Sequence, residues 1–540
     1  MAERLAGIQV REEAGFEQTV AEAPTAITAF VGRCLRGPVN RPVSLASFAD
    51  FQRVFGGLWQ PSTLSYAVEQ YFENGGRVAI VVRVVNGARC CTLQLPAEDG
   101  TLDLQALAPG TREFLRAAVD YDGIGGNEED RFNLVLQRVR TPGSEHIEDQ
   151  EIYRRLSMRP EAARHVVAGL AESQLVRIVN GVPSVRPEQT PRNDPRGLAG
   201  YVISNPDGDD GGPLTDYDLI GSAAQGTGLF ALDAVDTFNL LCIPPLTREV
   251  DIGASTLLVA NRYCRARRAV LFVDPPLAWD TAAKALGEMR NWPLPSDSAC
   301  MYFPRLLAYD KLRGRFEAFA PCGAVAGTMS RAAEASPVWS DNCGEDSVLR
   351  PGLRPMCAVD DESRTRLAAC GVNTAQTVRR PGREVQVACT LAGPGAAAAD
   401  WRSLPARRLA LMIINSIERG TRWMLFESNE QPAWRRAAAQ VRSFLASLDE
   451  RGAFAQHEPG DRWFVLCDER VNREQHRERG IVNLMFGFAA ARPGEFHAYL
   501  VSHRAGGSSV QPVSPNLAGL PGTGVTQALE VLELPVARGA

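Results

Sequence analysis

The fold class is decided by three short apolar runs: Asn239-Leu-Leu-Cys-Ile243, Ala269-Val-Leu-Phe-Val273 and Ala299-Cys-Met-Tyr-Phe303. Runs that are apolar at nearly every position are typical of strands buried on both faces of a sheet. Helices are predicted before and between them, near residues 228–238, 253–266 and 278–291. Strands and helices in alternation indicate a parallel sheet, so we expect an α/β domain over residues 201–395.

The chain before this domain divides into two segments of different character. Residues 23–89 form a core segment with strands over 26–32 and 78–85, a helix from the cap Ser47 to Phe55, and a helix over 64–72 ended by Asn74-Gly75-Gly76. Residues 90–200 are β-rich, with paired strands over 112–122 and 131–140, a helix over 161–172, a strand over 175–179 and a Pro/Arg/Asp-rich linker over 183–197. We expect this second segment to be an inserted domain on the outer surface.

The C-terminal part follows a linker of small residues over 391–400. Residues 396–494 are predicted to form an α+β core domain with helices over 407–419 and 432–450 and strands over 423–426, 463–467 and 481–489. Residues 495–540 are predicted to form one more strand, over 495–503, and an extended arm.

Two strands at the chain ends lack an evident partner. In the N-terminal arm, residues 1–22, Ile8 and Val10 alternate with Gln9 and Arg11 over 6–12. In the strand over 495–503 the two faces are Phe496, Ala498 and Leu500 against His497, Tyr499 and Val501. An isolated strand cannot pair its backbone or bury its apolar face, so we expect both strands to add to the sheets of other chains.

Composition argues against several classes of protein. The net charge is −5 and the pI is about 5.9, so no large positive field is available for a polyanion. The cluster Arg262, Arg265, Arg267 and Arg268 is at a helix end and has no groove-reading motif around it, so no nucleic-acid partner is expected. No signal peptide and no apolar run of about 18 residues is present, so we expect no membrane partner. Twelve cysteines without a signal fit free thiols in a reducing cytosol.

The sequence carries no recognisable catalytic or metal-binding pattern. Lys284 and Lys311 are the only lysines, and neither follows glycine as a P-loop requires. Gly327-Thr328-Met329-Ser330 resembles a serine nucleophile loop, but no histidine lies between residues 166 and 456 to act as its base. The cysteine spacing lacks the close pairs of a zinc site, and the acidic turn starting at Asp207 has Asp218 where a calcium loop has Glu. We therefore expect no catalytic residues, no metal and no cofactor; a cytosolic α/β hydrolase is the alternative.

Several longer motifs resemble the contractile tail sheath proteins, in the order that this family shows them. At the N-terminal end they are Gly7-Ile-Gln-Val-Arg-Glu-Glu13, Pro24-Thr-Ala-Ile-Thr-Ala-Phe-Val-Gly-Arg33, Gly37-Pro-Val-Asn40, Phe48-Ala-Asp-Phe-Gln-Arg-Val-Phe-Gly-Gly57 and Tyr71-Phe-Glu-Asn-Gly-Gly76. Further on they are Gly371-Val-Asn373, Pro381-Gly-Arg383, Arg407-Arg-Leu409, Ile417-Glu-Arg-Gly-Thr-Arg-Trp423 and Phe426-Glu-Ser-Asn-Glu430. The first motif departs from the family in having Ala6-Gly7 where Pro-Gly is usual.

The resemblance implies a structural protein of myophages, R-type pyocins or contractile injection particles. Its middle domain would be subtilisin-like in fold only, without a catalytic triad. Subunits would polymerise helically around an inner tail tube and contract to drive the tube through the target envelope, with the tube, baseplate and tail terminator proteins as partners. They would be assembled in the bacterial host cytoplasm and carried in the virion tail or the released particle. The resemblance implies exchanged terminal strands: Gly7, Ile8, Gln9, Val10, Arg11 and Glu12 at one end, and Phe496, His497, Ala498, Tyr499, Leu500 and Val501 at the other. A non-contractile surface or capsid protein is a second alternative.

Two side-chain groups give further hypotheses. Tube contact is expected from residues 432–450 or 471–480, where Arg470, Arg473, Arg477 and Arg479 alternate with Glu469, Glu474 and Glu478. A solvated charged loop explains the same pattern. Inter-subunit disulfides are expected from cysteines in loops or at strand ends, namely Cys34, Cys90, Cys91, Cys343 and Cys357. Buried free thiols are the alternative, and Cys242 and Cys467 in apolar runs fit it.

Overall fold

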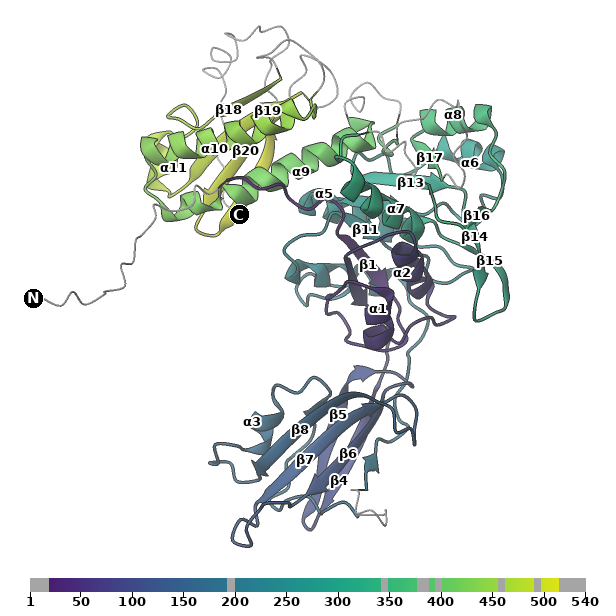
Figure 1. The fold of residues 1–540 in the computed structure, drawn as a ribbon, viewed down its shortest axis with the longest axis vertical. Helices are drawn as coiled ribbons and strands as arrows, with labels where there is room; N and C mark the ends of the chain where they lie inside the picture. Colours follow the sequence, from purple (N-terminus) through teal and green to yellow (C-terminus); the bar gives the residue numbers. More distant parts are fainter. Residues whose placement is uncertain are drawn as a thin grey trace, which may run out of the picture. The chain divides into compact units, whose positions relative to one another are not determined.

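A computed structural model describes residues 19–191, 200–340, 348–375, 388–393, 401–454, 462–489 and 497–513. The chain forms two compact units. The terminal unit contains Met1–Thr25, Ser336–Asp341 and Gln386–Ala540, and the central unit contains Ala26–Ala335 and Asn342–Val385. Each unit has its own sheets and helices (Figure 1). No helix in the described part of the chain is both long and apolar enough to cross a membrane.

The central unit is built on a seven-stranded sheet with the strand order β17-β13-β12-β11-β1-β3-β2. All neighbours are parallel except β2 and β3. The strands are β1 (Thr28–Gly32), β2 (Val43–Leu45), β3 (Ala79–Arg83), β11 (Leu240–Cys242), β12 (Val270–Val273), β13 (Ala299–Phe303) and β17 (Val372–Thr374). The three deciding apolar runs are β11, β12 and β13, which confirms the parallel sheet. The sequence prediction treated residues 23–89 and 201–395 as separate segments. They share this sheet, because β1 of the first segment pairs with β3 on one side and with β11 of the second segment on the other.

Helices connect the strands of this sheet. They are α1 (Phe48–Phe55), α2 (Thr63–Glu73), α4 (Asp216–Ile220), η1 (Gly228–Ala234), α5 (Ala254–Arg267), α6 (Ala282–Met289), α7 (Cys322–Ala335) and α8 (Asp361–Ala369). Ser47 caps α1 as predicted, and Gly56 ends it with φ of 87°. An α-helix was expected over residues 228–238, but the structure has the 3₁₀ helix η1 over Gly228–Ala234. A hairpin of β14 (Leu306–Asp310) and β15 (Arg315–Phe319) pairs with β16 (Arg354–Pro355) at the side of this unit.

The inserted β-domain (residues 90–203) consists of two antiparallel sheets around one apolar core. One sheet has the order β4-β5-β9 and the other β10-β6-β7-β8. The strands are β4 (Cys90–Ala97), β5 (Gly100–Pro109), β6 (Phe114–Asp120), β7 (Arg131–Val139), β8 (Ile147–Ser157), β9 (Val176–Ile178) and β10 (Val202–Ile203). The predicted pair over 112–122 and 131–140 is confirmed as β6 and β7. The expected helix over 161–172 is shorter, α3 (Val166–Leu170).

The terminal unit packs two long helices and an antiparallel sheet of order β18-β19-β20-β21 around one core (Figure 1). Its elements are α9 (Leu404–Gly420), η4 (Arg422–Phe426), α10 (Gln431–Glu450), β18 (Trp463–Leu466), α11 (Glu474–Glu478), β19 (Val482–Phe488), β20 (His497–Arg504) and β21 (Gly507–Val513). The strand predicted over 423–426 is wrong, because this run continues from the end of α9 as the 3₁₀ helix η4. A run of four apolar residues is too short for periodicity to separate strand from helix.

Candidate assembly surfaces of the terminal unit

The root of the N-terminal arm is held on α9. The backbone N–H of Ala23 donates to Ser416 Oγ at 2.8 Å, and Arg408 Nη2 donates to the carbonyl of Thr25 at 3.1 Å. Val20 packs where α9 ends, against Gly420, and Glu22 forms an ion pair with Arg451, the residue that follows α10. This anchorage was not predicted from the sequence. The proposed exchange residues Gly7, Ile8, Gln9, Val10, Arg11 and Glu12 lie outside the described residues.

The C-terminal strand is not isolated. β20 pairs with β19 over Phe488↔His497 to Val482↔His503, and with β21 over Ala498↔Val513 to Arg504↔Gly507. The prediction that this strand lacks a partner in its own chain is therefore wrong for His497, Ala498, Tyr499, Leu500 and Val501, while Phe496 lies outside the described residues. The hairpin arises because Gly507, with φ of 123°, allows the tight reversal after Arg504. The Gly506-Gly507 pair between two strand-forming runs was the signal that the prediction of an arm from residue 504 missed.

His503 joins three elements inside this unit. Its Nε2 lies 2.8 Å from Thr421 Oγ1 after α9, and its Nδ1 lies 2.7 Å from Ser508 Oγ on β21. The side chain is fully buried. Burial lowers the pKa of His503 to about 4, with Glu418 raising it and Arg422 lowering it further. The imidazole is therefore neutral at physiological pH and acts as a structural hydrogen-bonding group.

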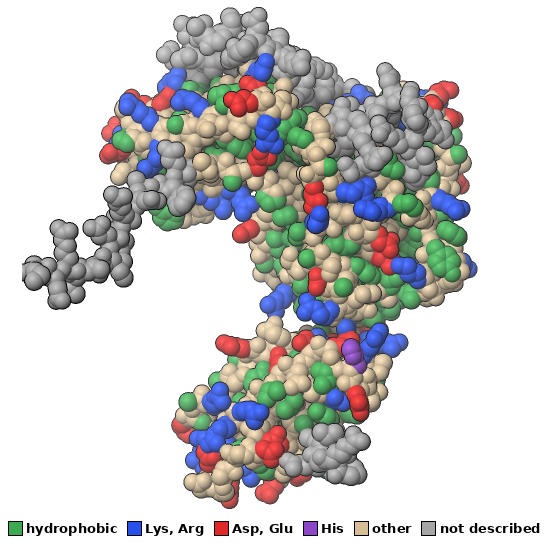
Figure 2. Space-filling model, viewed as in Figure 1, with side chains coloured by type: hydrophobic (Ala, Val, Ile, Leu, Met, Phe, Trp, Pro, Cys, Tyr) green, Lys and Arg blue, Asp and Glu red, His purple; other side chains and the backbone are tan. Residues whose placement is uncertain are grey.

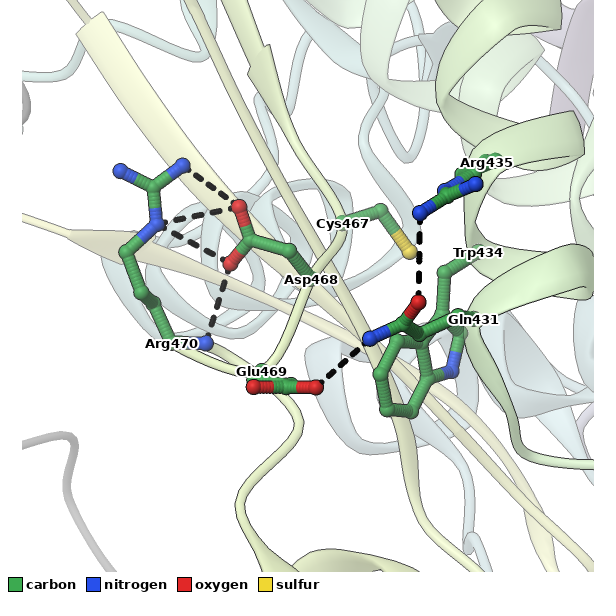
Figure 3. Close-up of a pocket in the computed structure, with 7 residues that line it drawn as sticks. All are labelled: Gln431, Trp434, Arg435, Cys467, Asp468, Glu469 and Arg470. Carbon is green, nitrogen blue, oxygen red and sulfur yellow. Dashed lines mark hydrogen bonds and ion pairs between the residues drawn. The ribbon is translucent and has the colours of Figure 1, made fainter.

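Of the two segments considered for tube contact, residues 432–450 line a cavity, and residues 471–480 approach it at Arg477. A cavity of about 330 Å³ is lined by Gln431, Trp434 and Arg435 of α10 and by Cys467, Asp468, Glu469 and Arg470 after β18 (Figure 3). Gln431 Nε2 donates to Glu469 at 2.7 Å, and the Arg477 guanidinium lies 5.8 Å from the Trp434 ring. The structure thus brings residues 432–450 and 471–480 to one surface.

The four arginines proposed for tube contact differ in their surroundings. Arg470 is half-buried, and its Nη2 donates to Asp468 at 2.5 Å, so its charge is already paired. Arg473, Arg477 and Arg479 are exposed beside or within α11. Burial lowers the pKa of His476, and the charges of Arg473 and Arg479 lower it further. The side chains of Arg473, Arg477 and Arg479 share α11 and its flanks with the exposed Glu474 and Glu478, so the surface there carries mixed charge.

Most of the proposed disulfide cysteines are buried. No disulfide joins any of the cysteines in the described part of the chain. Cys34 and Cys91 are 1% and 3% exposed, and burial raises their pKa values to about 12 and about 11. The expectation that they sit where a neighbour could reach them is wrong, because a loop or strand end next to a packed strand can be fully covered. Cys90 and Cys357 are half-buried, and Cys343 lies outside the described residues.

The nucleophile candidate does not sit on a loop. Ser330 lies within α7 and is 3% exposed, because Gly323 and Gly327 let this helix pack directly on the backbone of α2. Within the described residues no group of three or more His, Cys, Asp or Glu side chains is placed to hold a metal ion. The geometry at Ser330 therefore gives no support to the hydrolase alternative.

Comparison with known proteins gives a consistent result at the level of structure. No protein family model and no curated protein sequence matches this chain. A sheath tail protein from Listeria innocua matches with a TM-score of 0.59 and 12% identity over 90% of this chain and 97% of that chain. The sheath of an extracellular contractile injection system, PVC, in its contracted state matches with a TM-score of 0.52 and 17% identity over 92% and 96%. A sheath tail protein from Desulfitobacterium hafniense matches with a TM-score of 0.50 and 13% identity over 92% and 100%.

These likenesses define the class of fold. The chain has the mixed α/β and α+β architecture of sheath tail proteins, and the likeness covers nearly the whole length of each partner. The fold expected from the sequence resemblance is therefore confirmed at this coarse level.

Proposed function

We propose that this chain is a structural, non-enzymatic subunit of a contractile tail sheath. The observation that carries the proposal is the structural likeness to sheath tail proteins. It extends over at least 90% of both chains, although the sequences are only 12–17% identical. Motifs near both ends of the sequence support it. Subunits polymerise helically around an inner tube, contract, and drive the tube through the target envelope, as a phage tail or a related injection particle does. The central sheet of this subunit is subtilisin-like in fold only.

Assembly proceeds by strand exchange through the terminal unit. The N-terminal strand, Gly7 to Glu12, pairs with the four-stranded sheet of a neighbouring subunit, while β20 and β21 belong to the receiving sheet. A main-chain ladder of this kind supplies affinity, and the alternating side chains supply register. Because donor and acceptor are different surfaces, the contact is head-to-tail and produces an open helical filament.

Contraction needs no cofactor in this account. The extended sheath is a metastable lattice and the contracted one buries more surface between subunits, so release by the baseplate is enough to start the transition. The tube is contacted by the surface around Trp434, Arg473, Arg477 and Arg479. The tail terminator closes the end of the sheath that lies opposite the baseplate. Subunits are made in the bacterial host cytoplasm and then carried in the virion tail or released particle.

Removal of the arm tests this proposal. The purified full-length chain should form sheath-like tubular polymers, seen by sedimentation and negative-stain microscopy, whereas a chain lacking residues 1–14 should remain a folded monomer. The second chain keeps Val20 to Thr25, so its anchorage on α9 is intact. Normal polymers from the truncated chain would refute strand exchange, and monomers from the full chain under all conditions would count against a sheath.

A further inference from the structure

Two buried cysteines meet in the central unit, where helix α7 lies against strand β11 (Figure 1). Cys242 is the last residue of β11 and is 0% exposed, and Cys322 is the first residue of α7 and is 2% exposed. The thiol of Cys242 donates to the carbonyl oxygen of Cys322 at 3.7 Å, and each thiol is also a hydrogen-bonding partner of the other. A disulfide requires two cysteines at this kind of close approach, with their side chains directed toward each other.

The packing around both cysteines fixes this approach. The backbone N–H of Cys322 donates to Asp274 Oδ1, just after β12, at 3.0 Å. Gly323 holds the same turn of α7 directly on α2, where an added Cβ would lie 2.1 Å from the carbonyl oxygen of Ala67. Cys242 is held by β11, which is paired with β1 on one side and β12 on the other. The two sulfur atoms are therefore kept together by elements that are each anchored independently.

The same packing protects the pair from oxidation while the site is closed. Burial raises the pKa of Cys242, and burial together with the Cys242 thiol and the Asp274 carboxyl raises the pKa of Cys322 well above its ordinary value. Only a thiolate attacks a disulfide, so both cysteines persist as thiols in a reducing cytosol. Because helix ends fray, opening of the first turn of α7 exposes Cys322 before Cys242, which lies inside the sheet.

We infer that Cys242 and Cys322 form an internal disulfide by exchange with a low-molecular-weight disulfide, and that this bond fastens α7 to β11. The Cys322 thiolate attacks one sulfur of the reagent, and one reagent thiolate leaves. The Cys242 thiolate then attacks the sulfur of Cys322, and the second reagent thiolate leaves. The two cysteine thiols are oxidised to one disulfide, the reagent is reduced to two thiols, and these thiols take up the two protons that the cysteines release.

The bond would stabilise the central unit, because it closes a long loop that contains β12 and β13 and so restricts the unfolded chain. Bond formation is a property of the single chain. Its use rests on the proposed function, since a subunit made in a reducing cytosol meets an oxidising medium only after the particle is released.

A third buried cysteine provides a matched control. Cys264, in α5, is also 0% exposed, and Cys242 contributes to raising its pKa. If burial near Cys242 were enough for cross-linking, Cys264 would compete with Cys322 for the same partner.

Peptide mapping of the folded full-length chain tests the inference. The chain is incubated with glutathione disulfide or with dithiothreitol, in urea just below the unfolding transition so that helix ends open. Remaining thiols are then blocked with N-ethylmaleimide in denaturant and the digest is examined by mass spectrometry. We expect a linked pair of peptides containing Cys242 and Cys322, from a chain that runs as a monomer on a non-reducing gel. After removal of urea, the oxidised chain should unfold at a temperature about 5–10 °C higher than the reduced chain.

Three variants separate this bond from any other disulfide in the chain. Cys264→Ser should give the same linked peptides and the same rise in unfolding temperature as the parent. Cys322→Ser should lose both, and Cys242→Ala should do so from the other side of the bond, which keeps the test intact if one of them fails to fold. Circular dichroism establishes which variants are folded.

Four results would overturn the inference. They are blocked thiols at both Cys242 and Cys322 after incubation with glutathione disulfide, a link from Cys242 to Cys264, a link between two chains, and an equal rise in unfolding temperature in Cys322→Ser and the parent. Each of them leaves the proposed sheath function in place, because that function is tested separately by deletion of the arm.

Discussion

The buried side chain of His503 makes the stability of the terminal unit depend on pH. Its pKa is lowered to about 4 by burial, against about 6.5 in an unfolded chain, so folding favours the neutral ring. Its contribution to stability is complete above pH 6.5 and is lost as the pH falls toward 4, by up to about 3 kcal/mol. His503→Gln keeps a hydrogen-bonding side chain that does not titrate in this range.

Comparing the parent chain with His503→Gln isolates the effect of His503 on the free energy of unfolding. Burial raises the pKa of Asp274 in the central unit to about 6, which adds stability as the pH falls and opposes the His503 term. Both chains contain Asp274, so the difference between their free energies of unfolding should narrow between pH 6.5 and 4.5. Chemical denaturation at each pH measures it. A difference that is constant with pH would mean that His503 does not titrate out of its buried state.

The cysteines allow a second prediction at the residue scale. Only a thiolate reacts with an alkylating agent, and burial suppresses the thiolate of Cys34 and Cys91. In the folded chain, iodoacetamide should modify Cys357 at least tenfold faster than Cys34, as followed by peptide mass spectrometry. We propose that any disulfide between subunits uses Cys90, Cys343 or Cys357. Equal labelling of Cys34 would contradict the packing around it.

Residue types alone could not show which of these cysteines are buried in the fold. Cys242 and Cys467 lie within apolar runs, so their burial was predictable. Cys34 follows a strand and Cys91 is the second residue of one, and whether such a position is covered depends on chain segments that are distant in the sequence. For Cys91 one of these is Glu113, whose carbonyl accepts from the thiol at 3.3 Å. Burial of this kind is a property of the tertiary fold.

At the scale of elements, the anchorage of the arm depends on a small residue. A Cβ on Gly420 would lie 3.0 Å from Val20 Cγ2, so a larger side chain must displace Val20 from its place against α9. Gly420→Val should therefore weaken docking of residues 20–25 by about 1–3 kcal/mol and reduce assembly. Limited proteolysis near Val20 and sedimentation measure the two effects.

A matched helix variant serves as the control for Gly420. Gly287 lies in α6, where a Cβ would meet nothing within 4 Å, so Gly287→Val tests only the change of helix propensity. If both variants assemble equally well, the contact between Val20 and Gly420 has no role in presenting the arm.

Elements with strong periodicity were predictable, and short ones were not. Helices α9 and α10 and strands β11, β12 and β13 follow from runs that are long or apolar throughout. The run at η4 and the hairpin to β21 were missed, because one is four residues long and the other depends on a glycine turn. The strand β18 was predicted, but its place at one end of the sheet order and the contact of Arg442 with the carbonyl of Val465 appear only in three dimensions.

At the scale of the whole molecule, the inserted β-domain has its own core and a separable junction. Arg89 and Asp209 exchange backbone hydrogen bonds of 3.0 Å, so the two ends of the insertion lie side by side. Figure 2 shows acidic and basic side chains interspersed over the visible face of this domain, without a large apolar area. We propose that it projects from the outer surface of the sheath and contributes little to the lattice.

Deletion of the domain tests that placement. A chain with residues 90–208 replaced by a short glycine-serine linker should still fold and polymerise. Arg36 loses its ion pair with Glu148 in this chain, so Arg36→Leu is added to avoid a buried unpaired charge. Sedimentation and microscopy decide the outcome. A deleted chain that folds, as shown by its thermal unfolding, yet forms no polymer would place the domain in the lattice.

Negative-stain microscopy of particles from cells that produce this chain tests the sheath proposal most directly. An antibody against the inserted β-domain marks the subunit, and tails are measured before and after a contraction stimulus such as acid or denaturant. We predict that the label covers the whole tail in both a long, narrow form and a short, wide form, with the inner tube exposed in the short one. Label confined to a tail of a single length, or found only on free monomer, would contradict the account.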